Sequence, residues 1–139
     1  MEKQIKFILL FLLLFFLTSC STTTTTAIKR YRDFNHIDHW DQVESLTGTT
    51  LILYYSPYCE ICKSIEAEVA PALAFLAEAG YTVFLINEGF IYEQGTPPLE
   101  LIEVPSILVY QNHELDEKIS GSIPILRYLE SKLQESAGQ

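Results

Sequence analysis

The chain has 139 residues, of which 48% are hydrophobic, and its 9 basic and 18 acidic residues give a net charge of −9. This length allows one domain with a hydrophobic core of ordinary size and is too short for two. The acidic balance provides no basic surface for phosphate groups, which excludes nucleic acid as a partner.

The first 19 residues have the pattern of a secretory signal. Lys3 and Lys6 precede an unbroken apolar run over residues 7–17, and small residues follow it at a cleavage site. The run is shorter than the roughly 20 residues that a membrane-spanning helix needs. We therefore expect residues 1–19 to be removed, which makes the remaining chain slightly more acidic.

A lipid anchor is expected at Cys20. The preceding residues and this cysteine, Leu17-Thr18-Ser19-Cys20, resemble the lipobox of bacterial lipoproteins, whose cysteine becomes the lipid-bearing N-terminus. Two or three fatty chains there give stable membrane attachment. The Ser/Thr run that follows has no apolar residue to bury, so residues 20–26 are interpreted as the lipidated cysteine and a tether, and 27–139 as the domain. The alternative is ordinary secretory cleavage beside a chance cysteine.

The first half of the domain predicts a strand, a helix and a second strand. Residues 27–31 are expected to form a short strand. Apolar residues at every third position from Phe34 to Leu46 predict an amphipathic helix capped by Asn35 or Asp38. The continuous apolar run 51–55 predicts a strand buried on both faces.

The second half predicts a helix followed by further strands and a closing helix. Apolar spacing predicts a helix over 60–79, with Pro71 either kinking it or beginning a second helix. Strands are expected at 81–86, 106–110 and 114–120, a loop at 88–104 with a short helix near 96–102, and a final helix capped by Ser122. This order indicates an α/β fold with a central mixed sheet and helices on both faces.

A Cys-x-x-Cys pair lies between the strand at 51–55 and the following helix. Cys59 falls at the helix N-terminus, where free N–H groups and the helix dipole stabilise a thiolate. Cys62 follows one turn later, close enough to form a Cys59–Cys62 disulfide and to resolve a mixed disulfide on Cys59. The placement predicts thiol–disulfide exchange.

Together these features resemble the thioredoxin superfamily over about residues 31–136. The resemblance rests on the cysteine motif with its flanking strand and helix, on Val104-Pro105, on the stretch 106–114 and on Gly121. It implies a thioredoxin-like fold in which Pro105 is a cis-proline facing the cysteines.

The resemblance also implies roles for individual residues. Cys59 would be the attacking thiol and Cys62 the resolving one. The backbone of Val104, before Pro105, would pair with an extended substrate segment, and Tyr58 borders this substrate site.

The motif departs from thioredoxin itself. Thioredoxins carry a buried acid six residues before the first cysteine, where it helps deprotonate the second, and Leu53 stands there in this chain. Glu60-Ile61 replaces Gly-Pro between the cysteines. The Glu60 carboxylate disfavours the Cys59 thiolate, partly offset by Lys63, and a less stable thiolate makes the pair more reducing. Glu60, Ile61 and Lys63 are therefore expected to tune the redox potential towards a reductase or isomerase.

Two other functions fit the sequence. The cysteines can supply two metal ligands, with His36, His39 or His113 completing a zinc site. Solvent-exposed histidines are the simpler interpretation, so no metal is expected. A copper carrier is disfavoured because the only methionine, Met1, leaves with the signal. A tethered binding or accessory module with a vestigial disulfide is the other alternative.

The favoured interpretation is an extracytoplasmic thiol–disulfide oxidoreductase, anchored to a cell or outer membrane through Cys20. Its expected partners are exported proteins with cysteine pairs and a membrane electron donor or acceptor. No bound cofactor is expected, since the cysteines themselves carry the electrons.

Overall fold

The structure is a computed structural model that describes residues 29–91 and 103–138. The expected signal, lipidated cysteine and tether, and the short helix expected near 96–102, lie outside these residues. Within the described ranges, no helix has the length and apolar character needed to cross a membrane.

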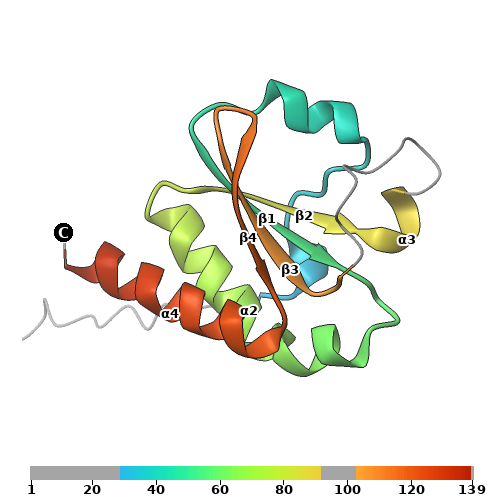
Figure 1. The fold of residues 1–139 in the computed structure, drawn as a ribbon. Helices are drawn as coiled ribbons and strands as arrows, with labels where there is room; N and C mark the ends of the chain where they lie inside the picture. The colour runs from blue at the N-terminus through green and yellow to red at the C-terminus, as the bar shows by residue number, and fades with distance from the viewer. Residues whose placement is uncertain (1–28, 92–102, 139) are drawn as a thin grey trace, which may run out of the picture.

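A four-stranded mixed sheet forms the centre of the domain (Figure 1). β1 pairs in parallel with β2 and antiparallel with β3, and β3 pairs antiparallel with β4, in the order β2-β1-β3-β4. The strands are β1 (Thr49–Tyr55), β2 (Thr82–Asn87), β3 (Ser106–Gln111) and β4 (Glu114–Ser120). Each strand prediction from residue 51 onward is confirmed to within two residues at its ends.

Helices pack against this sheet and connect its strands. The long helices α2 and α4 lie against each other on one side, as Figure 1 shows. The helical segments are the 3₁₀ helices η1 (Tyr31–Asp33) and η2 (Trp40–Ser45), and the α-helices α2 (Glu60–Glu78), α3 (Glu88–Ile91) and α4 (Ser122–Ala137).

Alternating side chains of the central strands enter two separate hydrophobic clusters. In β1, Leu51, Leu53 and Tyr55 face the cluster that contains residues of α2 and α4, called here the α2-side cluster. Ile52 and Tyr54 face the opposite cluster, which contains residues of η2 and is called the η2-side cluster. Because successive strand residues point to opposite faces, a continuous apolar run is what a sheet covered on both sides requires.

The segment before β1 differs from its prediction. Tyr31 begins a 3₁₀ helix, so the strand expected at 27–31 is wrong at its described end. Backbone pairing occurs later instead, at a single parallel bridge between His36 and Leu85 on the edge of β2. The amphipathic helix expected from Phe34 to Leu46 is also wrong, since only Trp40–Ser45 is helical, as a 3₁₀ helix.

The physical reason lies in the spacing. A strict three-residue period follows the three residues per turn of a 3₁₀ helix, whereas an α-helix of 3.6 residues per turn would rotate these positions progressively out of line. The apolar positions are still used for packing: Ile37, Val43 and Leu46 are buried in the η2-side cluster.

One of the two alternatives at Pro71 is excluded, and the predicted cap of the last helix is corrected. α2 continues through Pro71, so no second helix begins there. Gly121, with φ of 91°, is the N-cap of α4, and Ser122 is its first helical residue rather than its cap. A positive φ favours glycine because a Cβ is disfavoured in that conformation.

The α2 face of the core should dominate stability. Leu73 is fully buried in the α2-side cluster, whereas Phe75 on the same helix is exposed. We expect Leu73→Ala to lower the free energy of unfolding by about 2–5 kcal/mol, through lost transfer energy and a cavity. Urea unfolding of the reduced protein measures this, with Phe75→Ala as the control, for which a much smaller loss is expected. Equal losses would contradict this assignment of the core.

Candidate active site

Cys59 is the N-cap of α2, at the junction with the loop that follows β1. Its sulfur accepts a hydrogen bond from the backbone N–H of Cys62 at 3.1 Å. The first N–H groups of a helix lack partners within the helix, and negative charge is stabilised beside them. The predicted placement of Cys59 at a helix start is therefore confirmed.

Val104 lies against the same sulfur although it is 45 positions away in the chain. The Cys59 thiol donates to the Val104 carbonyl oxygen with an Sγ–O distance of 3.8 Å. The Val104–Pro105 peptide bond is cis, as the resemblance implied. The Pro105 carbonyl accepts the Gly121 N–H at 3.0 Å, which ties this loop to the start of α4. The structure thus brings Cys59, Val104 and Pro105 together.

Cys62 is buried, with 1% of its surface exposed, and both cysteines are free. Burial, followed by the hydrogen bond with Cys59, raises the pKa of the Cys62 thiol to about 12. In the reduced protein Cys62 is thus a thiol near neutral pH, so the two cysteines are chemically different.

Two large apolar side chains near Cys59 in the sequence are exposed. Tyr58 is 85% exposed and Ile61 is 53% exposed, on either side of Cys59 in the sequence. Large apolar side chains exposed on a protein surface commonly mark a place where a partner binds. Tyr58 and Ile61 are therefore exposed apolar side chains near Cys59 in the sequence.

Glu60 and Lys63 form an ion pair at the surface, with Nζ and Oε1 2.7 Å apart. The hydrogen bond with Glu60 is the main cause of the raised pKa of Lys63. The positive charge that was expected to offset Glu60 is therefore in contact with it.

Leu53 lies in β1, six residues before Cys59. It is fully buried in the same cluster as Cys62 and contributes no polar atom. The proton route that a carboxyl at this position would supply is absent.

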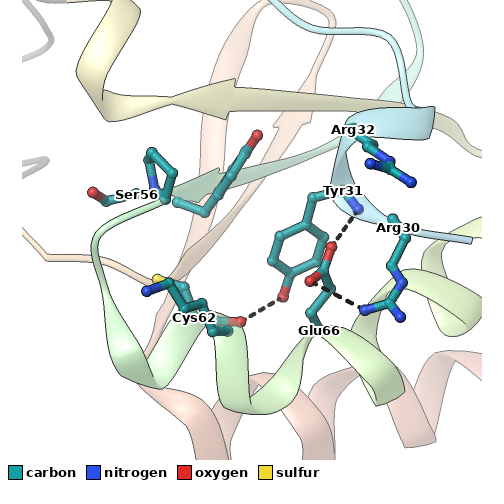
Figure 2. A pocket seen from close by; sticks show the side chains of 9 residues that line it. Arg30, Tyr31, Arg32, Ser56, Cys62 and Glu66 are labelled. Atoms are coloured by element: carbon teal, nitrogen blue, oxygen red, sulfur yellow. Dashed lines mark hydrogen bonds and ion pairs between the residues drawn. The ribbon is translucent and has the colours of Figure 1, made fainter.

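A cavity of about 490 Å³ lies beside Cys62, on the side of α2 that faces η1 (Figure 2). Tyr31 spans it: its hydroxyl donates to the Cys62 carbonyl oxygen at 3.3 Å, and its backbone N–H donates to Glu66 at 2.8 Å. The Tyr31 and Tyr55 rings pack with centroids 5.0 Å apart.

Sequence reasoning did not assign this cavity. A signal for Glu66 was present, since it follows Cys62 by four residues and positions i and i+4 share one helix face. No local pattern indicated Tyr31, which arrives from a different segment.

The metal alternative gains no support from the geometry. In residues 29–91 and 103–138, no three His, Cys, Asp or Glu side chains gather as a metal site requires. The ring nitrogens of His36 are hydrogen-bonded to the Phe34 carbonyl at 2.9 Å and the Tyr55 hydroxyl at 3.0 Å. His113 lies in the tight turn between β3 and β4 with a φ of 68°.

No protein-family model matches the chain, and no curated protein matches it. Solved structures match over most of its length. One, from work on the thiol-resolving mechanism of yeast mitochondrial 1-Cys peroxiredoxin via glutathione/thioredoxin systems, has a TM-score of 0.56 at 16% identity and covers 76% of this chain and 98% of its own. Oxidised mitochondrial thioredoxin 3 of Saccharomyces cerevisiae has a TM-score of 0.56 at 18% identity, with 76% and 97% covered. Malassezia sympodialis thioredoxin (Mala s 13) has a TM-score of 0.53 at 17% identity, with 74% and 90% covered.

At these identities the likeness establishes the fold. The chain has a thioredoxin fold, as its sequence resemblance predicted, and the Cys-x-x-Cys pair lies at the start of α2.

The two thiols should react at very different rates. In Cys62→Ser the remaining Cys59 is accessible at the helix start, whereas in Cys59→Ser the remaining Cys62 is buried and keeps its proton at pH 8. We expect iodoacetamide to label the first variant at least about tenfold faster, since the thiolate is the reacting form. Mass spectrometry over time measures both rates, and equal labelling would contradict the assigned difference.

Proposed function

We propose that this protein is an extracytoplasmic thiol–disulfide oxidoreductase that reduces or isomerises disulfides in exported proteins. The observation that carries the proposal is the position of Cys59: its sulfur is at a helix N-cap, receives the Cys62 N–H, and faces the Val104 carbonyl before a cis-proline. The fold shared with thioredoxins supports it.

The reaction follows from the difference between the two cysteines. The accessible Cys59 thiolate attacks a substrate disulfide and forms a mixed disulfide, releasing one substrate sulfur as a thiolate. Cys62, one helical turn away, then attacks the Cys59 sulfur and releases the second substrate sulfur. The protein ends with a Cys59–Cys62 disulfide, and the substrate has gained two electrons.

Substrate recognition is assigned to the surface around Cys59. The Val104 backbone next to Pro105 would pair with an extended segment of the substrate, and the exposed Tyr58 and Ile61 side chains would contact its apolar residues. Main-chain pairing gives affinity without a strict sequence requirement. We therefore assign the substrates as exported proteins with accessible cysteine pairs.

The direction of electron flow is inferred from Glu60. A carboxylate next to Cys59 destabilises its thiolate, which favours the disulfide form of the enzyme and hence reduction of the substrate. The contact with Lys63 weakens this effect without removing the negative charge. A reductase needs continuous resupply of electrons, so a membrane electron donor is the implied partner.

The location is inferred from the N-terminal sequence. Removal of residues 1–19 and lipid attachment at Cys20 would hold the domain at an extracytoplasmic membrane surface by a short Ser/Thr tether. In that position the active site would meet exported proteins.

The reduction potential of the Cys59–Cys62 pair tests the chemistry. We expect a value near about −270 mV, in the range of reducing thioredoxins, when the protein is equilibrated with graded thiol buffers and its free thiols are trapped by alkylation. A value near about −120 mV would instead indicate an oxidant. If no disulfide forms, the oxidoreductase proposal is wrong and the binding-module alternative replaces it.

Single substitutions test the assigned roles. Cys59→Ser is expected to abolish disulfide reduction, and Cys62→Ser to accumulate a mixed disulfide because attack proceeds without resolution. Non-reducing electrophoresis with a disulfide-bonded protein substrate separates these outcomes. Persistence of full activity in Cys59→Ser would contradict the mechanism.

The anchor is tested by Cys20→Ala in the full-length chain. We expect the wild type to sediment with membranes and to carry the mass of attached lipid, and the variant to lose both properties. Ser19→Ala, which keeps a small residue beside the cleavage site, serves as the control. A wild-type protein without lipid would contradict the anchor.

A further inference from the structure

We propose that Glu66 accepts the proton of Cys62 during resolution, through water in the cavity that both side chains line. This inference rests on the proposed oxidoreductase function and assigns a residue to its second step. Figure 2 shows the Glu66 carboxylate on the cavity side of α2, one turn beyond Cys62.

The second step needs a base close to Cys62. This thiol is buried and its pKa is raised, mainly by burial, so it attacks only after it has lost a proton. The fully buried Leu53 lies on the same side of the sheet and cannot accept that proton. The cavity that Cys62 lines offers a route for the proton.

Glu66 is in position to receive it. Residues four apart on a helix share a face, and Cys62 and Glu66 both line the same cavity. The carboxylate is held by the Tyr31 backbone N–H at 2.8 Å and lies 3.8 Å from the Arg30 guanidinium. Its side chain is 22% exposed, so the proton can pass on to solvent.

The phenols that face this cavity are poorer acceptors. The hydroxyl of Tyr31, from η1, is engaged with the Cys62 carbonyl, and burial raises its pKa. The hydroxyl of Tyr55, from β1, is hydrogen-bonded to His36, and burial together with the charge of Glu66 raises its pKa. A phenol with a raised pKa keeps its proton and is a weak base near neutral pH.

The cations that line the cavity cannot accept a proton. Lys63 lies in contact with Glu60 on the helix surface. Arg30 and Arg32 are arginines, which remain protonated in proteins. In the described part of the chain, Glu66 is thus the carboxylate among the residues that line the cavity.

The step balances in protons and electrons. The Cys62 S–H proton passes through water to Glu66, and the thiolate attacks the Cys59 sulfur of the mixed disulfide. The Cys59–Cys62 bond forms as the bond from Cys59 to substrate breaks, and the electron pair leaves on the substrate sulfur. That thiolate takes up a proton from solvent, and Glu66 releases its own.

Reaction with 5,5′-dithiobis(2-nitrobenzoate) separates the two steps, because attack by Cys59 releases the first nitrothiobenzoate and resolution by Cys62 releases the second. In stopped-flow measurements, we expect Glu66→Gln to slow the second release by about 100-fold near pH 7, the lower end for loss of a general base. The first release should stay within about twofold. The glutamine oxygen can still accept the Tyr31 N–H, so the variant removes charge with little change of shape.

The pH profile distinguishes a proton acceptor from a structural residue. In Glu66→Gln the second release should rise about tenfold for each pH unit, because hydroxide replaces the carboxylate, whereas the wild-type rate should be flatter. Glu66→Asp should restore part of the rate, and Glu68→Gln, on the exposed surface of the same helix, should match the wild type.

Two outcomes would overturn the proposal. If Glu66→Gln releases the second nitrothiobenzoate at the wild-type rate and with the wild-type pH profile, another group takes the proton. The oxidoreductase function would then still stand. A wild-type protein that gives the first release without a second would overturn the oxidoreductase function as well.

Discussion

The hydrogen bond from the Cys62 backbone N–H to the Cys59 sulfur is the contact on which the site depends. It forms because β1 ends and α2 begins with a cysteine at the N-cap, so that an otherwise unpartnered helix N–H points at sulfur. The same geometry makes the second cysteine the first buried residue of the helix. One helix start therefore produces an accessible thiol and a protected one.

The rest of the fold holds that helix start in place. β1 is central in the sheet, buried on both faces, and it carries the loop that presents Cys59. β3 begins one residue after Pro105, which places the Val104 carbonyl against the sulfur from the neighbouring strand. α4 packs on α2 behind the site. A change of register between β1 and β3 would separate Cys59 from Val104.

This domain differs from thioredoxins in where a carboxylate lies near the buried cysteine. The fully buried Leu53 offers no carboxylate, whereas Glu66 on α2 lines the cavity beside Cys62. The segment of η1 positions it, because Tyr31 contacts both the Cys62 carbonyl and Glu66. Tyr58 is exposed beside Cys59, and Glu66 lines the cavity beside Cys62.

The sequence by itself determined the four strands and the position of Cys59 at a helix start, and its resemblance to the thioredoxin superfamily predicted the fold. The strands and the helix start depend on local signals, such as the apolar run that ends at Ser56-Pro57 and the helical period that begins beside the cysteines and ends at Gly80. Only the tertiary structure decided how much of the three-residue period before β1 is helical, and that edge pairing occurs at His36. It also decided that Tyr31 and Glu66 would enclose the space beside Cys62. Those features come from contacts between residues far apart in the chain, such as the 35 positions that separate Tyr31 from Glu66, and no local pattern carries them.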